Sequence, residues 1–284
     1  MTKKIIALDM DGTFLTSKGE ITDENRKAVR DAQAAGHLVM VCSGRAYDTL
    51  IPFLKEENLA DLPFSGSNGA VTVVDGEIIH RVAMDINSAK VLWGWLNDHK
   101  YPFKIYTNQG AYEPSDLFER AEFEFSTAPP VDNGHFSDVE VMKKYANKYP
   151  GIKIASFDEM PTGVEIFKFY VLTPNMEKKA AVESFAKEIA GLTITSSFMD
   201  NVELTDALGH KGTGIVEMAK HFKIPLEDTV AMGDNFNDIG MLQTAGLAVA
   251  MGNAEEAIKE IADVITLTND ENGVAYAIRE YVLK

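Results

Sequence analysis

The stretch that most constrains the fold lies near the N-terminus, at residues 4–13, and has the sequence KIIALDMDGT. An apolar run without polar alternation predicts a central parallel strand that is covered on both faces. The run ends at Asp9, so this carboxylate falls at the carboxyl end of the predicted strand. Open α/β sheets bind their ligands at that end of their strands, and we therefore expect a ligand site there.

Two carboxylates follow the run closely, because a single residue separates Asp9 from Asp11, and Gly12 then permits a tight turn. In an extended chain both side chains can point the same way, and two neighbouring anions repel each other. A hard cation such as Mg²⁺ would hold them together, because it prefers oxygen ligands. Taken alone, however, the stretch is better explained as an Asx-rich turn after a strand.

Length and charge limit the class of protein. The 284 residues exceed one typical domain, and 45% hydrophobic content is sufficient for a packed core with a second lobe. Asp and Glu number 43 against 27 Lys and Arg, and the resulting net charge of −16 argues against general binding to nucleic acid or to an anionic membrane.

Cysteine content and apolar runs bear on localisation. The single cysteine, Cys42, permits no intrachain disulfide and no cysteine-based zinc cluster, which fits a reducing cytoplasm. The apolar run before Asp9 is too short for a signal peptide, and the sequence contains no apolar stretch as long as a membrane span. We therefore predict a cytoplasmic protein that binds neither membrane nor nucleic acid.

The first 83 residues alternate between strand and helix patterns. Thr22 is a predicted N-cap, and Gly36 is placed to end the helix that follows. A second buried strand at residues 37–42 ends in Ser43-Gly44-Arg45, and a third short strand leads to the sequence SNGA at residues 67–70. Residues 70–74 and 77–81 predict a hairpin around Asp75-Gly76. This β-α-β-α-β order predicts a doubly wound sheet.

The middle of the chain has a different texture, with more aromatic residues and an irregular alternation of strands and helices. We interpret residues 84–197 as an α+β cap domain inserted into a doubly wound, mostly parallel, Rossmann-like core formed by residues 1–83 and 198–284. The clearest helices of the insert are predicted near residues 87–100, 137–149 and 175–189, and the clearest strands at residues 103–107, 165–173 and 192–197.

The α/β pattern returns after residue 201, where Val202-Glu203-Leu204 precedes a helix that begins near Lys211. A short buried strand at residues 229–232 ends in the sequence GDNFND, which carries Asp234, Asn237 and Asp238. A strand at residues 247–250, the turn MGNA and a last helix from Gly273 complete the predicted core.

Polar side chains thus gather at the strand-to-helix junctions, which lie along one edge of a parallel sheet. Alone, Ser43 is best explained as a helix cap, Lys211 as a surface lysine and Asn237 as a capping amide. Together with the carboxylates they match what transfer of a phosphoryl group to a carboxylate requires. All the reactants are anionic, and cations and hydrogen-bond donors must neutralise the transition state.

These motifs resemble, in order, those of the haloacid dehalogenase-like superfamily: DMDGT from Asp9, SGR from Ser43, Lys211, and GDNFND from Gly233. The sequence SNGA at residues 67–70 and the sequence AMGNA at residues 250–254 are also similar to those of the Cof-type sugar phosphatase branch, which has a class IIB cap. The resemblance covers essentially the whole chain.

The resemblance implies a role for each motif residue. Asp9 would be the nucleophile, and Asp11 the acid that protonates the leaving alcohol and the base that then activates water. The groups implied to hold Mg²⁺ are Asp9, the backbone carbonyl of Asp11, and Asp234, with Asp238 acting through water or indirect contacts. The groups implied to bind phosphate oxygens are the amide of Met10, Ser43, the backbone of Gly44, Lys211 and Asn237.

Two supporting residues complete the implied site. Thr13 would orient Asp11. Arg45 would either contact phosphate or form a structural pair with an acid, and the sequence leaves both options open.

Topology narrows the subclass that the chain resembles. One helix and one strand occupy the chain between Thr13 and Ser43 and leave no room for a small helical cap. The inserted domain lies instead between Ser43 and Lys211, as does the larger α/β cap of Cof-type enzymes, which roofs the site and limits substrates to small molecules.

The function predicted from the sequence is Mg²⁺-dependent hydrolysis of a small phosphorylated metabolite, a sugar phosphate, through an aspartyl-phosphate on Asp9. One alternative is a phosphomutase acting on hexose phosphates, and another is a non-catalytic phosphate-binding regulator. The presence of both Asp9 and Asp11 argues against the regulator, because a pure binder needs no nucleophile paired with an acid. A cysteine phosphatase is excluded, because Asp48 stands where its loop after Cys42 would need arginine. The sequence does not set the oligomeric state.

Overall fold

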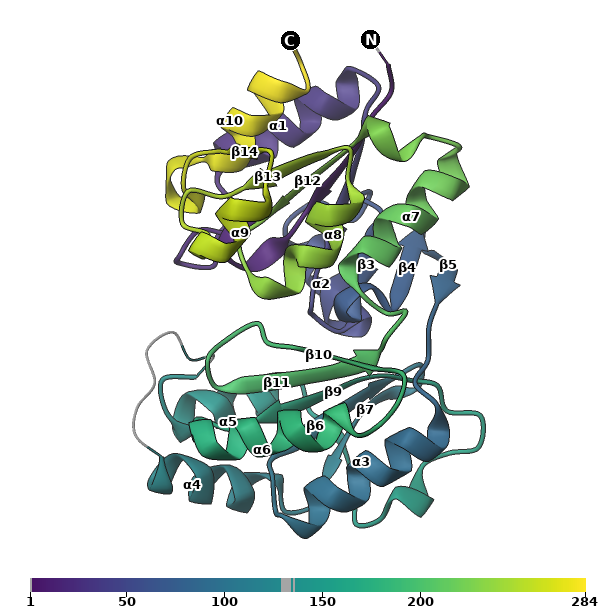
Figure 1. Ribbon diagram of the computed structural model, residues 1–284, viewed down its shortest axis with the longest axis vertical. Coiled ribbons are helices and arrows are strands. Elements are labelled where there is room, and N and C mark those ends of the chain that lie inside the picture. The colour runs from purple at the N-terminus through teal and green to yellow at the C-terminus, as the bar shows by residue number, and fades with distance from the viewer. Residues whose placement is uncertain (1, 129–133, 135) are drawn as a thin grey trace. The chain divides into compact units, whose positions relative to one another are not determined.

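The computed structural model describes residues 2–128, 134 and 136–284. The chain forms two compact units (Figure 1). The first unit contains residues Met1–Arg81 and His210–Lys284, and the second contains Val82–Gly209. The second unit is therefore an insertion within the sequence of the first.

An eight-stranded sheet forms the centre of the first unit. Neighbouring strands are parallel from β14 to β3, and β3, β4 and β5 pair antiparallel. Its strands in spatial order are β14 (Val264–Ile265), β13 (Leu247–Ala250), β12 (Thr229–Gly233), β1 (Ile5–Leu8), β2 (Leu38–Cys42), β3 (Phe64–Gly66), β4 (Val71–Val74) and β5 (Glu77–Arg81).

The order of the strands determines where ligands bind. From β1 the chain proceeds through β2 to β3 on one side, whereas from β12 it proceeds through β13 to β14 on the other side. Right-handed crossovers then place the connecting helices of the two halves on opposite faces of the sheet. The direction reverses between β1 and β12, and ligands of doubly wound folds bind at such a reversal.

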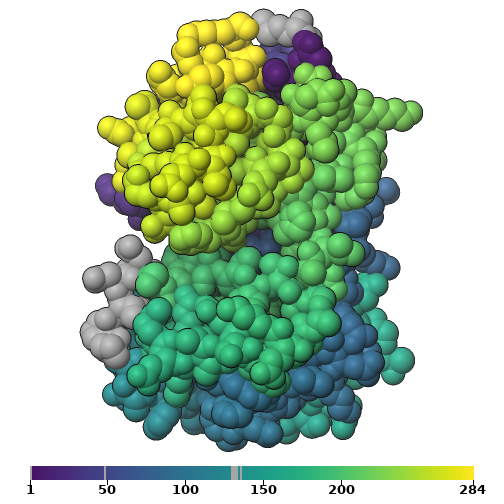
Figure 2. All heavy atoms as spheres, viewed as in Figure 1, coloured from purple at the N-terminus to yellow at the C-terminus, as the bar shows by residue number. Residues whose placement is uncertain are grey.

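The helices of the first unit cover this sheet. They are α1 (Asp23–Ala34), α2 (Tyr47–Glu56), α7 (Lys211–Phe222), α8 (Ile239–Thr244), α9 (Glu256–Ile261) and α10 (Gly273–Tyr281). Helix α1 packs beside α10, and α7 packs beside α8. On the face drawn in Figure 2, the C-terminal segment from α7 onward, coloured green to yellow, makes most of the surface of this unit.

The second unit contains a six-stranded sheet with helices packed against it. In spatial order the strands are β10 (Leu192–Thr195), β11 (Asn201–Asp206), β9 (Ile166–Leu172), β6 (Phe103–Thr107), β7 (Gly110–Pro114) and β8 (Ile152–Ile154). All neighbours are antiparallel except β7 and β8. The helices are α3 (Ile86–Asp98), α4 (Leu117–Thr127), α5 (Val139–Lys148) and α6 (Met176–Lys187).

The predicted fold class is confirmed, as are most predicted elements. Thr22 caps α1 by accepting a hydrogen bond from the Asn25 backbone N–H, and the β4–β5 hairpin turns at Asp75-Gly76. Helix α4 and strands β7 and β8 were not predicted. The largest difference is β11, which was assigned to the core but pairs with β9 and β10 of the second unit. The second unit accordingly ends at Gly209, whereas the predicted cap ended at residue 197.

The reason for this difference is the burial pattern. Residues 201–205 are all buried, as in a central strand of either sheet, so the pattern alone does not identify the sheet to which they belong.

Among the described residues, no helix has both the length and the apolar character needed to span a membrane.

Candidate active site

Two strand ends at the reversal of the sheet bring the acidic motifs together. Asp9 follows β1, and its backbone N–H donates to the Met232 carbonyl of the neighbouring strand β12 at 3.0 Å. Asp234 follows β12, and Asp238 stands immediately before α8. The predicted convergence of these motifs at one sheet edge is therefore present in the structure.

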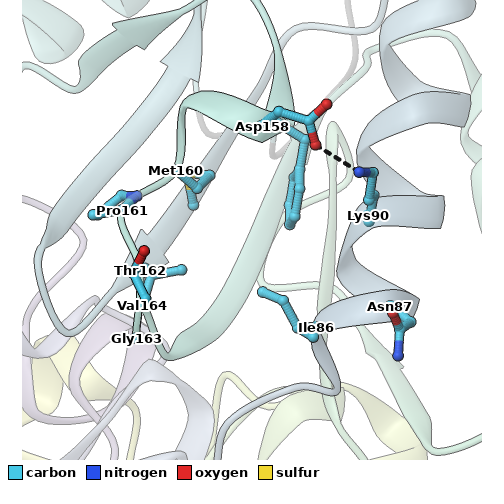
Figure 3. A pocket seen from close by; sticks show the side chains of 10 residues that line it. Ile86, Asn87, Lys90, Asp158, Met160, Pro161, Thr162, Gly163 and Val164 are labelled. Carbon is cyan, nitrogen blue, oxygen red and sulfur yellow. Dashed lines mark hydrogen bonds and ion pairs between the residues drawn. The ribbon is translucent and has the colours of Figure 1, made fainter.

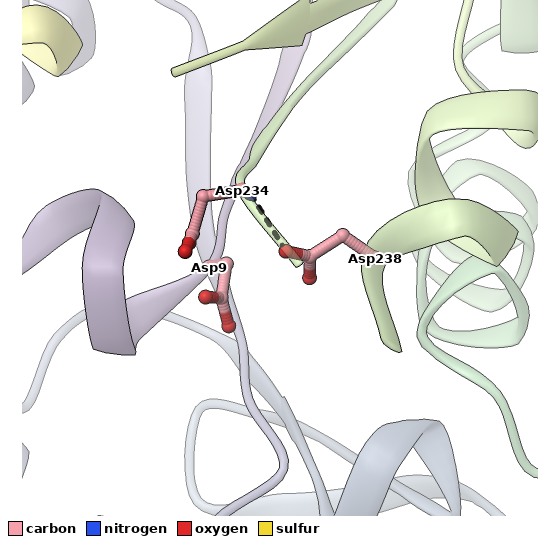
Figure 4. Close-up of side chains that lie close together, drawn as sticks. All are labelled: Asp9, Asp234 and Asp238. Carbon is pink, nitrogen blue, oxygen red and sulfur yellow. Dashed lines mark hydrogen bonds between the residues drawn. The ribbon is translucent and has the colours of Figure 1, made fainter. Parts of the chain in front are cut away.

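The three carboxylates point toward one another (Figure 4). One oxygen from each of Asp9, Asp234 and Asp238 lies within 4.8 Å of the others. Asp9 and Asp238 are buried, and Asp234 is half-buried. Three acidic side chains so close together in a region of low water content repel one another strongly, so the cluster needs cationic partners.

Lys211 supplies one cation. Its buried ammonium group lies 2.5 Å from Oδ1 of Asp9 and 2.5 Å from Oδ1 of Asp238. Burial alone would lower the pKa of Lys211, but attraction to Asp238 and Asp9 outweighs burial, and the pKa is raised. The residue is thus held in the charged form between two carboxylates, which excludes the interpretation of a solvated surface lysine.

The other oxygen of Asp238 has backbone partners. Its Oδ2 accepts from the N–H groups of Asp234 at 2.9 Å and Asn235 at 3.0 Å. Both oxygens of Asp238 are therefore engaged by other groups of the protein. It nevertheless belongs to the carboxylate cluster, whereas the predicted metal ligands were Asp9, the Asp11 carbonyl and Asp234.

The pKa values of the other two acids of the cluster, Asp9 and Asp234, are raised because the carboxylates are buried close together. Burial, together with the nearby charge of Asp238, raises the pKa of Asp9 well above its ordinary value. The same two causes raise the pKa of Asp234 to about 7, despite a hydrogen bond from Thr13 that lowers it. Since a bound cation favours deprotonated carboxylates, and all the donors are hard oxygens, the residues present fit Mg²⁺.

The turn after Asp9 is built around Gly12 and Thr13. Gly12 has φ +86°, and a Cβ there would lie 2.3 Å from Oδ2 of Asp234, so only glycine fits. The Thr13 hydroxyl donates to Oδ1 of Asp234 at 2.7 Å. The prediction assigned this hydroxyl to Asp11. The turn instead aims it across to the strand end of β12, because residues 10–14 fold back on themselves rather than continue extended.

Arg45 pairs with Asp11. Its Nε donates to Oδ2 of Asp11 at 3.1 Å, and its Nη2 donates to Oδ1 at 2.7 Å. The sequence left two roles open for Arg45, a contact with phosphate and a structural pair with an acid. The observed geometry corresponds to the second role. The side chain of Asp11 lies outside the cluster formed by the other three acids.

The predicted phosphate-binding residues surround Asp9 on neighbouring elements. Met10 follows Asp9 directly, and Ser43 and Gly44 follow β2, the strand beside β1. The Ser43 side chain is buried, and its Oγ accepts from the Arg45 backbone N–H at 3.1 Å. Asn237 lies in the turn between Asp234 and Asp238 and is half-buried.

Sequence reasoning missed the role of Asn253. Its Nδ2 donates to the Gly12 carbonyl at 2.8 Å, and its Oδ1 accepts from the Asn269 backbone N–H at 2.9 Å. The next loop residue but one, Glu255, donates its N–H to the Asp234 carbonyl at 3.1 Å. The MGNA turn thus braces both acidic loops. The sequence AMGNA at residues 250–254 was noticed through its family resemblance. The residue types in it did not indicate which groups Asn253 contacts.

Cys42 is buried, and burial raises the pKa of its thiol to about 12. A thiol so hard to ionise is a poor nucleophile at neutral pH. The prediction that Cys42 belongs to the core is confirmed.

A separate cavity of about 330 Å³ lies in the second unit, between the start of α3 and the loop around Phe157–Val164 (Figure 3). Its only lining acid, Asp158, pairs with Lys90 at 2.5 Å. The cavity has no acidic cluster of the kind formed by Asp9, Asp234 and Asp238, so it does not compete as the catalytic centre.

Comparison with known proteins identifies relatives of the chain. Residues 6–278 match the family model of the haloacid dehalogenase-like hydrolases. The chain is 35% identical to phosphatase YwpJ of Bacillus subtilis over 97% of this chain and 99% of that protein. It is 32% identical to the 5-amino-6-(5-phospho-D-ribitylamino)uracil phosphatase YwtE of the same organism, over 97% and 96%.

The fold has solved counterparts. The HAD subclass IIB sugar phosphatase BT4131 superposes with a TM-score of 0.79 at 24% identity, over 99% of this chain and all of that structure. At that identity the likeness shows a common fold, which includes an inserted domain between the two parts of the core.

Proposed function

The chain belongs to the haloacid dehalogenase-like hydrolases and is a phosphatase of that family; from this premise we propose that it hydrolyses small phosphomonoesters with Mg²⁺, through an aspartyl-phosphate on Asp9. The observation that carries the proposal is the position of Lys211, buried between Asp9 and Asp238 with 2.5 Å contacts to both. A surface protein–protein contact or a structural ion pair would not need a third carboxylate, Asp234, close to the carboxylates of Asp9 and Asp238.

In the first step, a carboxylate oxygen of Asp9 attacks the phosphorus atom, the bond from phosphorus to the ester oxygen breaks, and Asp11 gives its proton to the departing alcohol. In the second step, Asp11 takes a proton from water, whose oxygen attacks the same phosphorus. The bond to Asp9 then breaks, inorganic phosphate leaves, and both acids return to their initial states.

The surrounding donors would neutralise charge during transfer. The Lys211 ammonium already contacts Asp9 and would contact the incoming phosphate oxygens, together with Ser43, Asn237 and the backbone N–H groups of Met10 and Gly44. Asp9, Asp234 and the Asp11 carbonyl would hold Mg²⁺, with Asp238 fixed by Lys211 and the loop N–H groups. When bound, Mg²⁺ supplies positive charge that offsets repulsion between the acids and the phosphate.

Arg45 has a defined part in this scheme. A bidentate guanidinium pair stabilises the ionised form of Asp11, so the paired carboxyl is a poor proton donor and also a weak base. Proton donation therefore requires the pair to open or weaken when substrate binds. The same opening would restore the proton affinity that Asp11 needs in the second step, so Arg45 would hold Asp11 ionised between turnovers.

Sugar phosphates are the proposed substrate class. YwtE, a relative at 32% identity, is named for a substrate whose phosphate sits on a ribityl chain, which is a sugar alcohol. The core motifs would contact only phosphate and metal, so a small polyol phosphate would fit their chemistry without further requirements. A phosphomutase remains the alternative function, since transfer from Asp9 back to a sugar would use the same residues.

The test combines product analysis with a variant. With Mg²⁺ and a panel of sugar phosphates, we expect free inorganic phosphate rather than an isomeric sugar phosphate; a bisphosphate-dependent isomer product would favour the mutase. Asp9→Asn should abolish turnover and also the phosphoryl adduct that mass spectrometry detects on the acid-quenched enzyme. The fold should survive, because Asp238 still pairs with Lys211.

The matched control for this variant is Asp31→Asn, which removes an exposed carboxylate that pairs with Lys27 on α1. This variant should keep wild-type activity. Removal of Mg²⁺ with EDTA should stop the reaction, and added Mg²⁺ should restore it. Hydrolysis at the wild-type rate by folded Asp9→Asn, or after complete chelation, would refute the proposal.

A further inference from the structure

A short loop, Ser67–Gly69, has no part in the reaction scheme but has an unusual backbone. Ser67, Asn68 and Gly69 have φ values of +52°, +56° and +96° in succession. Left-handed conformations are uncommon outside glycine, and two consecutive non-glycine residues in this region persist only where the surroundings hold them. We call this segment the spacer loop.

On one side the spacer loop is bound to the motif that follows β2. The Ser67 N–H donates to the Arg45 carbonyl at 2.7 Å, and the Asn68 N–H donates to the Ser43 carbonyl at 3.0 Å. The Ser43 N–H donates in turn to the Ser65 carbonyl at 2.8 Å. The left-handed backbone therefore directs consecutive N–H groups onto the Ser43–Arg45 segment.

On its other side the spacer loop touches the residue before Lys211. A Cβ placed on Gly69 would lie 2.0 Å from the carbonyl oxygen of His210, 2.3 Å from its carbonyl carbon, and 2.9 Å from the Lys211 nitrogen. The backbones of the loop and of the first turn of α7 are thus in direct contact. No side chain fits between them.

Two other close contacts enclose the same turn. A Cβ on Gly212 would lie 2.3 Å from the Gly240 carbonyl oxygen of α8. A Cβ on Gly214 would lie 2.4 Å from Oγ of Ser65, the middle residue of β3. The backbone that carries Lys211 is therefore held by the spacer loop, by α8 and by β3, each through a glycine.

We propose that the spacer loop sets the distance between Ser43 and Lys211 across Asp9, and that Gly69 is a positioning residue for phosphoryl transfer. The inference rests on the proposed function, because Lys211 and Ser43 matter together only if both contact a phosphoryl group. A misplacement on the order of 1 Å can lower the rate by about 100-fold. A methyl group on Gly69 has no room unless His210 and Lys211 move.

The main test compares Gly69→Ala with Gly76→Ala. Both glycines have positive φ, at +96° and +80°, so both substitutions strain the backbone to a similar degree. Gly76 has no atom within 4 Å of its would-be Cβ, so only Gly69→Ala displaces a neighbour. We expect kcat to fall by about 100-fold in Gly69→Ala and by less than about 3-fold in Gly76→Ala.

A second pair of variants pushes the same turn from β3 and guards against a Gly69→Ala protein that does not fold. Gly214→Ala keeps an ordinary helical φ and gains helix propensity, so only its contact with Ser65 is unfavourable. In Ser65→Gly/Gly214→Ala the obstructing Cβ and Oγ are gone, and the next atom, Cε of Met40, is at 3.8 Å. We expect Gly214→Ala to lower kcat and the double variant to recover most of it.

Crystal structures of the variants provide a readout that does not depend on turnover. The distance from Lys211 Nζ to Asp9 Oδ1, 2.5 Å in the native protein, should increase in Gly69→Ala and not in Gly76→Ala. Unchanged kcat in folded Gly69→Ala, or in Gly214→Ala if the first variant does not fold, would overturn the positioning role. An unshifted Lys211 in the folded variant would do the same.

Failure of the proposed function is a separate outcome. If the wild-type protein with Mg²⁺ releases no phosphate from any phosphomonoester tested, the proposed function fails. Calorimetric titration with inorganic phosphate and Mg²⁺ then tests the positioning alone. Weaker phosphate binding in Gly69→Ala than in Gly76→Ala would support it, and equal binding in the two variants would overturn it.

Discussion

Removing the charge of Lys211 offers the most direct test of how the acidic cluster is held together. Lys211→Met keeps most of the side-chain volume but leaves Asp9 and Asp238 facing each other without the ammonium group that lies 2.5 Å from both. The lysine side chain is fully buried, so water cannot replace it easily. We expect both loss of turnover and a large loss of stability in the first unit.

The magnitude follows from burial. Breaking a buried ion pair by removing one partner costs about 3–5 kcal/mol, because the other charge stays buried and unpaired. A matched control exists on α1, where Lys27 lies 2.6 Å from Asp31 but is 64% exposed. An exposed helical pair of this kind contributes about 0.5 kcal/mol or less, so Lys27→Met should change stability by no more than that.

The loss in Lys211→Met should depend on pH. Burial and the charge of Asp238 already raise the folded-state pKa of Asp9, and loss of the ammonium group raises it further. A carboxyl whose folded pKa is raised stabilises the fold below its unfolded pKa and loses that contribution as pH rises through the folded value. The destabilisation should therefore be smaller at pH 5 than at pH 8, and added Mg²⁺ should reduce it at pH 8.

The assay must report on the first unit. Both tryptophans, Trp93 and Trp95, lie in the second unit, so their fluorescence during urea unfolding serves as an internal control. Hydrogen exchange of the β1 and β12 amides reports on the unit that carries Lys211. Protection in Lys211→Met equal to wild type at pH 8 without Mg²⁺ would show that the three acids do not need this cation.

Three further outcomes are expected. Asp11→Asn should slow esters with poor leaving groups far more than activated aryl phosphates, which need little protonation as they depart; equal losses in kcat/KM would remove Asp11 from the acid role. Arg45→Ala should slow esters with poor leaving groups less than Asp11→Asn does, since it removes only the partner that pairs with Asp11 at 2.7 Å. Equal losses on esters with poor and with activated leaving groups would indicate that Arg45 contacts the phosphate instead. Thr13→Val deletes the hydrogen bond that lowers the pKa of Asp234, so Mg²⁺ titrations should show half-maximal binding at higher pH, and an unchanged pH profile would contradict that coupling.

Much of the site could be predicted from the sequence because its chemistry sits at strand ends. A buried apolar run followed by an acid or a hydroxyl indicates a strand and also the end at which its polar group lies, as residues 5–9 and 38–43 show. Parallel strands bring such ends to one edge without further information. The edge that holds Asp9, Ser43 and Asp234 could therefore be located before any contact was known.

Hydrogen-bond partners could not be predicted in the same way. The family resemblance implied that Thr13 orients Asp11, but its hydroxyl reaches Asp234 because the chain reverses at Gly12. The assignment of β11 to the core sheet was wrong for a related reason. Its first five residues are all buried, and such a pattern does not identify the neighbouring strands. The direction of the turn at Gly12 and the sheet that β11 joins both depend on how the whole backbone is folded.

Charge balance explains why the site combines these groups. The acids gathered at the sheet edge are Asp9, Asp11, Asp234 and Asp238, and the cations that pair with them are Lys211 and Arg45. With all acids ionised, the formal excess is two negative charges, which a divalent cation would cancel. A phosphomonoester dianion then meets a neutral site rather than an anionic one. Without the divalent cation the same substrate faces net repulsion in a buried setting, so binding of phosphate and of Mg²⁺ should strengthen each other.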